Sequence, residues 1–395
     1  MTHLNYLEKL LDGEIVEWIA LGDVTLIKTG QAVSKQAIST NPGQYPVINS
    51  GKEPLGFIDK WNTDNDPIGI TTRGAGVGSI TWQEGKYFRG NLNYSVTIKD
   101  SANLEVRYLY HLLHQMQSAI QSLCTFDGIP ALNAGSLKGL EIPIPCPNDP
   151  KKSLEIQAEI VRILDAFTAV TAELTAELNM RKKQYNYYRD QLLSFEEGDV
   201  EWKTLEYLCE SISAGGDVPK NSAKGQAEPT SEFPYPIYAN ATDEKGLYGF
   251  TDNYKIDSDA VTISARGAKV GYHTVREAKF TPIIRLIVLV ADKSLIITRY
   301  LNYVLDMTPI GGTEGGIPQL TVPMVKKITV PIPFPNDPEK SLVEQARIVA
   351  ILDKFDTLTT SLQEGLPREI ELRQKQYEYY RDLLLSFPKP EEAAA

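Results

Sequence analysis

Apolar residues recur at helical spacing in two long stretches of the chain. Between residues 160 and 195, alternating steps of four and three residues connect a mostly apolar or aromatic series, the heptad pattern of a helix that packs against another helix. The second stretch, residues 348–387, contains an extra four-residue step near Gly365 and Pro367. We therefore predict a continuous first helix and a break or kink in the second.

Each predicted helix needs an apolar partner, and the simplest partner is the other helix. The aromatic pairs within the seam resemble base-stacking residues, but their heptad positions favour packing between helices. Asp149 followed by Pro150 predicts the start of the first helix, since an acidic cap before proline is typical of helix N-termini. The predicted seam positions are Leu164, Phe167, Leu174, Leu178, Tyr185, Tyr188, Leu192, Leu352, Phe355, Leu362, Tyr377, Tyr380 and Leu384.

The segments before the two helices differ from them in composition. They are rich in glycine, proline, asparagine, tyrosine and β-branched runs, such as 261–264 and 283–290. These runs predict short strands joined by loops, with some helix around residues 106–122. The fold class is therefore α+β, with two mixed α/β domains and two long helices. We place the domain boundaries at 1–147, 148–198, 199–335 and 336–390.

The chain contains its own sequence twice, with a period of about 190 residues. Residues 143–154 recur as 331–342, and residues 181–195 recur as 373–387, with few changes. The globular segments share weaker matches, including an arginine and glycine motif. The N-terminal segment resembles the end of the first long helix, so the order globe, helix, globe, helix closes on itself as a circular tandem repeat.

Composition excludes several classes of protein. A chain of 395 residues that is 42% hydrophobic and 23% charged predicts two or three globular domains. Its three separated cysteines argue against a disulfide framework or a cysteine zinc site, and favour a reducing cytoplasm. We expect no membrane span. The net charge of -11 means that any DNA binding would use local basic patches, or a partner that contacts the phosphates.

No constellation of catalytic residues is recognisable, and we expect no catalytic site, cofactor or metal. His111 and His114 stand three residues apart on a predicted helix, where we interpret them as partly exposed polar residues rather than ligands. The glycines at 74–78 do not have phosphate-loop spacing, and Lys269 replaces the middle glycine in the second copy. A binding protein is therefore favoured over an enzyme.

Several duplicated motifs resemble those of specificity subunits of type I restriction–modification systems. They include the helix ends Lys-Gln-Tyr-x-Tyr-Tyr-Arg-Asp-x-Leu-Leu and the Pro-Ile-Pro segments (Ile-Pro-Ile-Pro in the first copy) that lead into Gln157-Ala and Gln345-Ala. Ile129-Pro-Ala-Leu132 and Ile317-Pro-Gln-Leu320 are also typical of this family. The resemblance covers essentially the whole chain.

The resemblance implies two target recognition domains joined by two antiparallel helices. Each domain would recognise one half of a bipartite, asymmetric sequence in double-stranded DNA. The resemblance also implies a complex with two adenine-N6 methyltransferase subunits, to which two translocating endonuclease subunits can be added. The chain itself would be non-catalytic, and its partners would carry out DNA methylation and restriction.

Candidate DNA contacts follow from the duplication. Arg73 and Arg266 occupy the same place in both copies, beside glycines that allow close backbone approach, and arginine binds guanine edges or phosphate. A structural arginine that ties the loop to its own domain is the alternative. Sequence choice should depend on residues that differ between the copies. These candidates are Thr72, Lys52, Arg89, Lys245, Lys269, Tyr272 and His273.

Three rival interpretations remain open at this point. The same architecture also suits a stand-alone methyltransferase or a fused nuclease system. From another class, a coiled-coil adaptor whose globular domains bind proteins would have the same repeat. A cryptic nuclease or hydrolase would instead show metal-dependent turnover by the purified chain.

Overall fold

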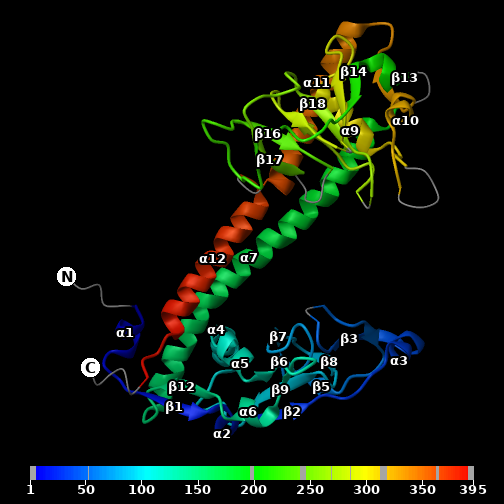
Figure 1. Cartoon of the computed structure of the whole chain (residues 1–395). Helices are drawn as coiled ribbons and strands as arrows, with labels where there is room; N and C mark the ends of the chain where they lie inside the picture. The colour runs from blue at the N-terminus through cyan, green and yellow to red at the C-terminus, as the bar shows by residue number, and fades with distance from the viewer. Residues whose placement is uncertain are drawn as a thin grey trace. The chain divides into compact units, whose positions relative to one another are not determined.

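The computed structural model describes residues 6–51, 53–195, 200–240, 246–267, 269–284, 286–311, 318–361 and 364–389. The chain forms two compact units, each with one globular domain and parts of both long helical segments. Unit 1 comprises residues 1–175 and 369–395, and unit 2 comprises residues 176–368 (Figure 1). The two ends of the chain thus belong to one unit, which confirms the circular organisation.

The globular domain of unit 1 contains two four-stranded sheets. Their strands are β2 (Thr25–Thr29), β3 (Pro42–Ile48), β4 (Phe57–Ile58), β5 (Thr63–Asp64), β6 (Ile68–Thr71), β7 (Ile80–Trp82), β8 (Lys86–Arg89) and β9 (Asn93–Ile98). The first sheet has the order β2-β9-β6-β7 and is antiparallel. The second has the order β4-β3-β8-β5, in which β3 and β8 are parallel.

In its own globular domain, unit 2 repeats the strand order of the first sheet and of three strands of the second sheet. Its strands are β14 (Cys209–Ala214), β15 (Ser222–Lys224), β16 (Tyr235–Tyr238), β17 (Leu247–Thr251), β18 (Ala260–Ser264), β19 (His273–Arg276), β20 (Thr281–Pro282) and β21 (Leu286–Ala291). One sheet has the order β14-β21-β18-β19, and the other has the order β15-β17-β16-β20 with a parallel pair, β16 and β20. The predicted strand at 261–264 is confirmed by β18. The strand predicted at 283–290 is shorter at its start, because β21 begins only at Leu286.

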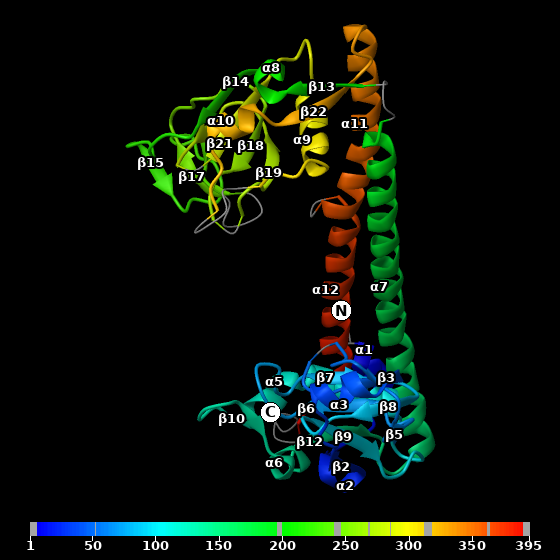
Figure 2. The same ribbon diagram turned by 90° about the vertical axis from the view of Figure 1, so that its right-hand side faces the viewer.

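Helices pack on each first sheet. In unit 1 these are α4 (Val106–Gln115) and α5 (Gln117–Ser122), as predicted for residues 106–122. In unit 2 the equivalent helix is α9 (Thr298–Asp306), which lies against α11 (Figure 2). The fully buried Tyr108 and Tyr300 stand at the centres of these helices' apolar faces. The shorter elements are α2 (Leu21–Val24), α3 (Lys35–Thr40), β10 (Cys124–Thr125), β11 (Ala131–Leu132), α6 (Ala134–Lys138), α8 (Leu205–Leu208) and α10 (Val322–Lys326).

The duplicated proline segments form strands. In unit 1, β12 (Glu141–Pro145) pairs with β1 (Val16–Ala20), and Trp18 stands opposite Pro143. In unit 2, β22 (Thr329–Pro333) pairs in the same register with β13 (Val200–Thr204). Proline is tolerated in these two-stranded ladders because each strand has a free edge that needs no further donor.

Three helices form the long helical segments. They are α7 (Pro150–Leu193), α11 (Pro338–Thr360) and α12 (Leu366–Leu385). The carboxylates of Asp149 and Asp337 accept hydrogen bonds from the first turns, at 3.1 Å from the amide of Lys152 and 3.0 Å from that of Lys340. The predicted cap is therefore confirmed. The predicted break before Pro367 is also confirmed, because α11 ends at Thr360 and α12 begins at Leu366.

The apolar seam is continuous with the core of each globular domain. In unit 1, α7 and α12 lie side by side, and the ring of Phe167 stacks on that of Tyr380 at 5.0 Å (Figures 1 and 2). In unit 2, Tyr188 stacks on Phe355 at 5.5 Å, and Tyr185 lies 6.5 Å from the same ring.

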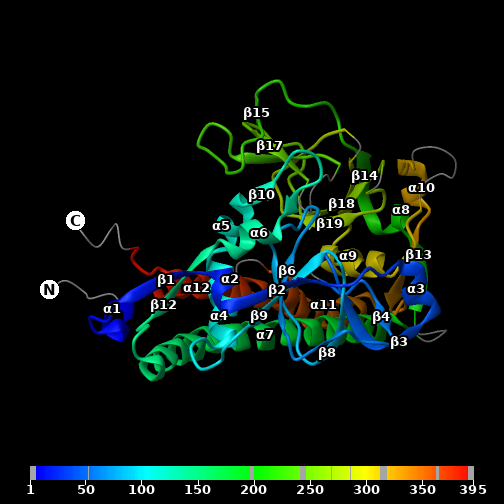
Figure 3. The same ribbon diagram turned by 90° about the horizontal axis from the view of Figure 1, so that it is seen from below.

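The remaining seam positions differ in burial. Leu164 and Leu352 are 0% exposed, and Leu384 is 1% exposed. The half-buried positions are Leu174, Leu178, Leu192 and Tyr377, whereas Leu362 lies outside the described residues. At the start of the chain, α1 (Tyr6–Leu11) inserts Leu7 and Leu11 into the unit 1 core, near the end of α12 (Figure 3). Among the described residues, no helix is long and apolar enough to cross a membrane.

Replacing Leu164 or Leu352 by Ala is expected to lower the free energy of unfolding by about 2–5 kcal/mol, because each substitution leaves a cavity in a closed core. Urea unfolding of the full chain, followed by circular dichroism, measures the change. Val170→Ala is the control, since Val170 is 41% exposed on the same helix as Leu164. Equal effects at buried and exposed positions would contradict the continuous core.

Candidate nucleic-acid interface

The arginine and glycine motif forms the same loop in both units. The first arginine loop (residues 72–79) connects β6 to β7, and the second (residues 265–272, in which residue 268 is not described) connects β18 to β19. The amide of Gly78 donates to the carbonyl of Thr71 at 2.8 Å, and that of Gly271 donates to Ser264 at 2.9 Å. These equivalent bonds show that the two loops share one backbone conformation.

Glycine is required in these loops by backbone conformation. Gly74 has a φ of +93° and Gly267 a φ of +86°, in the left-handed region that other residues rarely adopt. A Cβ added at either position would meet no atom within 4 Å. Glycine is therefore required by the backbone conformation of the turn that follows each arginine, and not by a lack of space for a side chain.

The backbones of Arg73 and Arg266 are held on both sides. Arg73 forms a bridge with Ala131, and Arg266 forms one with Gln319. The side-chain amide of Asn240 also donates to the carbonyl of Arg266 at 2.8 Å. The side chain of Arg73 is exposed and that of Arg266 is half-exposed.

Neither guanidinium has a hydrogen-bond or ion-pair partner among the described residues. Each loop thus presents free cationic donors from a fixed backbone, which suits contact with phosphate or with a base edge.

A short hairpin lies beside the first arginine loop. Strands β10 and β11 flank its tip, and the amide of Gly74 donates to the carbonyl of Pro130 at 3.0 Å. Phe126 and Ile129 at this tip are 64% and 66% exposed. Ile129 stands out in the sequence only as part of a motif, and Phe126 does not stand out at all, because local sequence gives no sign of the exposure of an apolar residue.

The second loop and the strand that follows it hold three of the seven other candidates, Lys269, Tyr272 and His273. Lys269 is exposed, at the place that Gly76 occupies in the first loop, and Tyr272 is half-buried. Thr72 is 7% exposed, and its main chain bonds to Leu92 and Leu132. Lys52 and Lys245 lie outside the described residues.

His273 opens β19 immediately after the second loop. Its Nδ1 lies 3.0 Å from the carbonyl oxygen of Gly271. Its Nε2 lies 3.2 Å from the carboxylate of Asp306, an ion pair rather than a well-aligned hydrogen bond. Burial alone would lower the pKa of His273, but Asp306 and the Gly271 carbonyl outweigh it, and the pKa is raised. His273 thus fastens the loop to α9.

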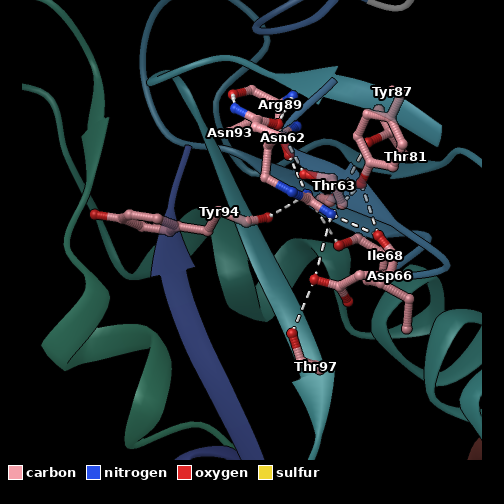
Figure 4. A network of polar contacts seen from close by, with 11 residues as sticks. Asn62, Thr63, Asp66, Ile68, Thr81, Tyr87, Arg89, Asn93, Tyr94 and Thr97 are labelled. Carbon is pink, nitrogen blue, oxygen red and sulfur yellow. Dashed lines mark hydrogen bonds and ion pairs between the residues drawn. The ribbon is translucent and has the colours of Figure 1, made fainter. Parts of the chain in front are cut away.

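Arg89 lies inside the unit 1 domain, in the polar network of Figure 4. Its side chain is 4% exposed, and its Nη1 donates to the carbonyls of Ile68 and Tyr94, both at 3.1 Å. The same atom donates to Asn93 at 2.6 Å, and Nη2 donates to the carbonyl of Asp66 at 2.6 Å.

These bonds hold β8 to β6 and β9. Burial lowers the pKa of Arg89, and the nearby Tyr87 and Asp66 oppose that effect. Because the guanidinium is enclosed by its own domain, we do not propose Arg89 as a DNA contact.

His111 of α4 is buried, so its interpretation as a partly exposed residue was wrong, whereas His114 is half-buried, in agreement with that interpretation. His111 is 0% exposed, and burial lowers the pKa of His114 to about 4. The His111 side chain faces the long helices, where it contacts Asp165 of α7 and Tyr377 of α12. Across the described residues, no group of three histidine, cysteine or acidic side chains is arranged to hold a metal ion.

Comparisons with known proteins agree on one family. The model of the type I restriction modification DNA specificity domain matches residues 14–181 and 197–372. The type I restriction enzyme EcoR124I/EcoR124II specificity subunit of Escherichia coli is 38% identical, with 99% of each chain covered. A putative type I restriction enzyme specificity subunit of Haemophilus influenzae is 32% identical, over 97% of this chain and 98% of that protein.

A solved structure has the same fold. The crystal structure of the S subunit of a type I restriction–modification system from M. genitalium matches with a TM-score of 0.65 at 20% identity. The match covers 96% of this chain and 97% of that one. Two mixed α/β domains with long helices are thus an architecture shared with a solved relative.

Replacing Asp306 by Asn is expected to destabilise the chain more at low pH than at high pH. A raised pKa means that the folded chain binds the His273 proton more tightly than the unfolded chain. The resulting stability is fully present below about pH 6.5 and is lost as the pH rises through the raised value. Urea unfolding at about pH 5.5 and pH 8.5 measures both losses. In a His273→Asn background the difference should disappear; equal losses at both pH values in the wild-type background would contradict this linkage.

Proposed function

This chain belongs to the family of type I restriction–modification DNA specificity proteins, and we propose that it is the non-catalytic subunit that selects the DNA sequence in such a system. The observation that supports this role is the pair of arginine loops. Two globular domains whose first sheets have the same strand order present the same loop with a free arginine. Methylation and restriction would then be carried out by partner subunits in the cytoplasm.

The two domains are suited to two different half-sites. Their loops share a backbone, but Lys269 replaces Gly76, and Gln319 replaces Ala131 at the bridge to the arginine. Contacts to phosphate fix the position of a protein on DNA, whereas side chains at base edges select the sequence. A common loop with different neighbours would therefore bind two unlike sequences in a similar way, and the target would be bipartite and asymmetric.

The hairpin beside the first loop adds an apolar surface to this proposal. Phe126 and Ile129 are exposed next to a bound backbone segment of the first arginine loop. Apolar side chains at such tips contact thymine methyl groups or enter between base steps. The hairpin would thus extend the contact that Arg73 begins.

Duplicated helix surfaces support two copies of a methyltransferase partner. Tyr187 on α7 and Tyr379 on α12 occupy equivalent positions and are 61% and 64% exposed. Each packs edge to face on the next tyrosine, Tyr188 or Tyr380. Equivalent exposed aromatic pairs suit the same partner surface twice. Such partners would also supply the phosphate contacts that a chain with a net charge of -11 needs. Two endonuclease subunits could join the same complex.

The proposal is tested by expressing the chain with its methyltransferase and sequencing the methylated bases of the host genome. We expect methylated adenines in a single bipartite sequence. Replacing residues 20–140 by those of a relative should change one half of that sequence and leave the other half unchanged. Methylation without a sequence preference, or a change in both halves, would contradict the assignment of one half-site to each domain.

Replacing Arg73 or Arg266 by Ala is expected to lower the rate of methylation, because the domain that carries the substitution binds its half-site less tightly. The loss of a bidentate or phosphate contact should reduce kcat/KM by about 5- to 150-fold. Lys9→Ala is the control, since Lys9 is exposed on α1 outside the loops.

The salt dependence of binding separates the two kinds of contact. A phosphate contact predicts a salt slope reduced by about one, whereas a base contact predicts relaxed sequence choice at one position. Activity equal to wild type in both arginine variants would exclude the loops from the interface.

A further inference from the structure

A buried glutamine joins each globular domain to its long helix. In unit 1, Gln157 of α7 is 0% exposed, and its Oε1 accepts from the amide of Glu105, the cap of α4, at 2.8 Å. Its Nε2 donates to the carbonyl of Asn103 at 3.1 Å and to the hydroxyl of Ser153 at 3.0 Å. Gln157 thereby satisfies main-chain groups of the globular domain at the start of α4.

Unit 2 repeats this contact. Gln345 of α11 is also 0% exposed, and its Oε1 accepts from the amide of Ile297, the cap of α9, at 2.9 Å. Its Nε2 donates to the carbonyl of Leu295 and the hydroxyl of Ser341, both at 3.1 Å. The same side-chain atoms thus bond to equivalent groups in both units.

An aspartate makes a second polar contact between the globular domain and the long helix of unit 1; we call each such contact, including that of the glutamine, a joint. Asp165 stands eight residues after Gln157, about two helical turns, and so faces the same side of α7. Its Oδ1 accepts from Nε of Arg107 at 2.8 Å and lies 2.7 Å from Nε2 of His111. The Nδ1 of His111 lies 3.0 Å from the hydroxyl of Tyr377 on α12.

The hydrogen bonds of His111 fit a neutral ring. Nε2 donates to the Asp165 carboxylate, and Nδ1 accepts from the Tyr377 hydroxyl. Burial lowers the pKa of His111, although Asp165 partly offsets that effect. One imidazole thus connects α4 with both α7 and α12 (Figure 3 shows α4 beside α7).

Unit 2 uses a tyrosine in place of this histidine. Asp353, eight residues after Gln345, accepts from Nε of Arg299 at 2.8 Å and from the hydroxyl of Tyr303 at 2.6 Å. Arg299 and Tyr303 occupy on α9 the positions of Arg107 and His111 on α4. The sequences have changed, but both aspartates still receive one arginine and one neutral donor.

Polar joints of this kind restrict orientation more than apolar packing does. An apolar interface tolerates small shifts, whereas an enclosed amide satisfies its partners in one arrangement only. Two joints about two turns apart also prevent α4 and α9 from pivoting on the long helix. Each globular domain is therefore fixed in register and angle on the helix within its own unit.

We infer that Gln157 with Asp165, and Gln345 with Asp353, are positioning residues that set the angle of each recognition domain on its helix and thereby restrict the spacing of half-sites that the subunit accepts. This inference rests on the proposed function. A domain held at one angle can engage its half-site only when the other half-site lies at a matching distance and rotation along the duplex. A shift of about 1 Å in a positioned group is enough to reduce a rate substantially.

The experiment compares Asp165→Ala and Asp353→Ala with wild type, each assembled with its methyltransferase. Methylation rates are measured on the cognate target and on targets whose spacer is one base pair longer or shorter. We expect the preference of the wild type for one spacer to fall about tenfold in each variant, with the half-site sequences unchanged. Glu155→Gln is the matched control, because Glu155 lies on α7 with its side chain 67% exposed.

Tyr303→Phe keeps the joint testable if an alanine variant fails to unfold cooperatively. It removes one hydroxyl from the Asp353 joint and retains the buried ring, and a smaller loss of spacer preference is expected. Spacer preference at the wild-type level in folded variants would overturn the inference, as would an equal loss of rate on every target. If the wild-type complex methylates no defined sequence, the proposed function itself fails.

Discussion

The structure depends on apolar surface of the long helices that is buried in the core of the globular domain within each unit. Leu164 and Leu352 stand at equivalent positions and are fully buried, each within the core cluster of its own unit. A free-standing helix pair would expose the side that these residues occupy. Burying apolar surface contributes about 25 cal/mol per Å². Separating a globular domain from its helix would expose the apolar side chains that the domain and the helix bury against each other. This continuity explains why the compact units divide the long helices rather than end where the helices begin.

Local signals predicted the parts of this fold that depend on neighbouring residues. Heptad spacing, the acid and proline at helix starts, and the interruption before Pro367 each act over a few residues, and the structure confirms them. The strands formed by the proline segments were not predicted, because their partner strands are remote in sequence and no local pattern shows the pairing of β1 with β12. The common strand order of the two first sheets was not predicted either, since the sequences of the two globular domains share only scattered residues.

The candidate site was predictable only where the duplication exposed it. Recurrence singled out Arg73 and Arg266, whose loops share one backbone conformation. Nothing in the sequence showed that the Arg89 guanidinium is buried, because its carbonyl partners come from β6, β9 and the loop before β6. Gln157 appeared in a recognisable motif, but its partners are main-chain atoms, which have no sequence signature. Contacts between a side chain and a distant backbone are thus the part of the architecture that sequence patterns cannot supply.

The pairing of charges explains how a chain with a net negative charge can still be suited to binding DNA, which is a polyanion. Arginines on the long helices are compensated by nearby carboxylates, as in the pairs of Arg162 with Glu159 and Arg347 with Glu344, each at 2.7 Å. The loop arginines have no such partner among the described residues. Under the proposed function, the overall field would oppose the approach of DNA, whereas the loops would favour contact once the duplex is close. Attraction of the DNA and selection of its sequence then need not come from the same surface. Partner subunits can attract the phosphates without reading the sequence, and uncompensated arginines on rigid loops can contribute to the selection of the sequence.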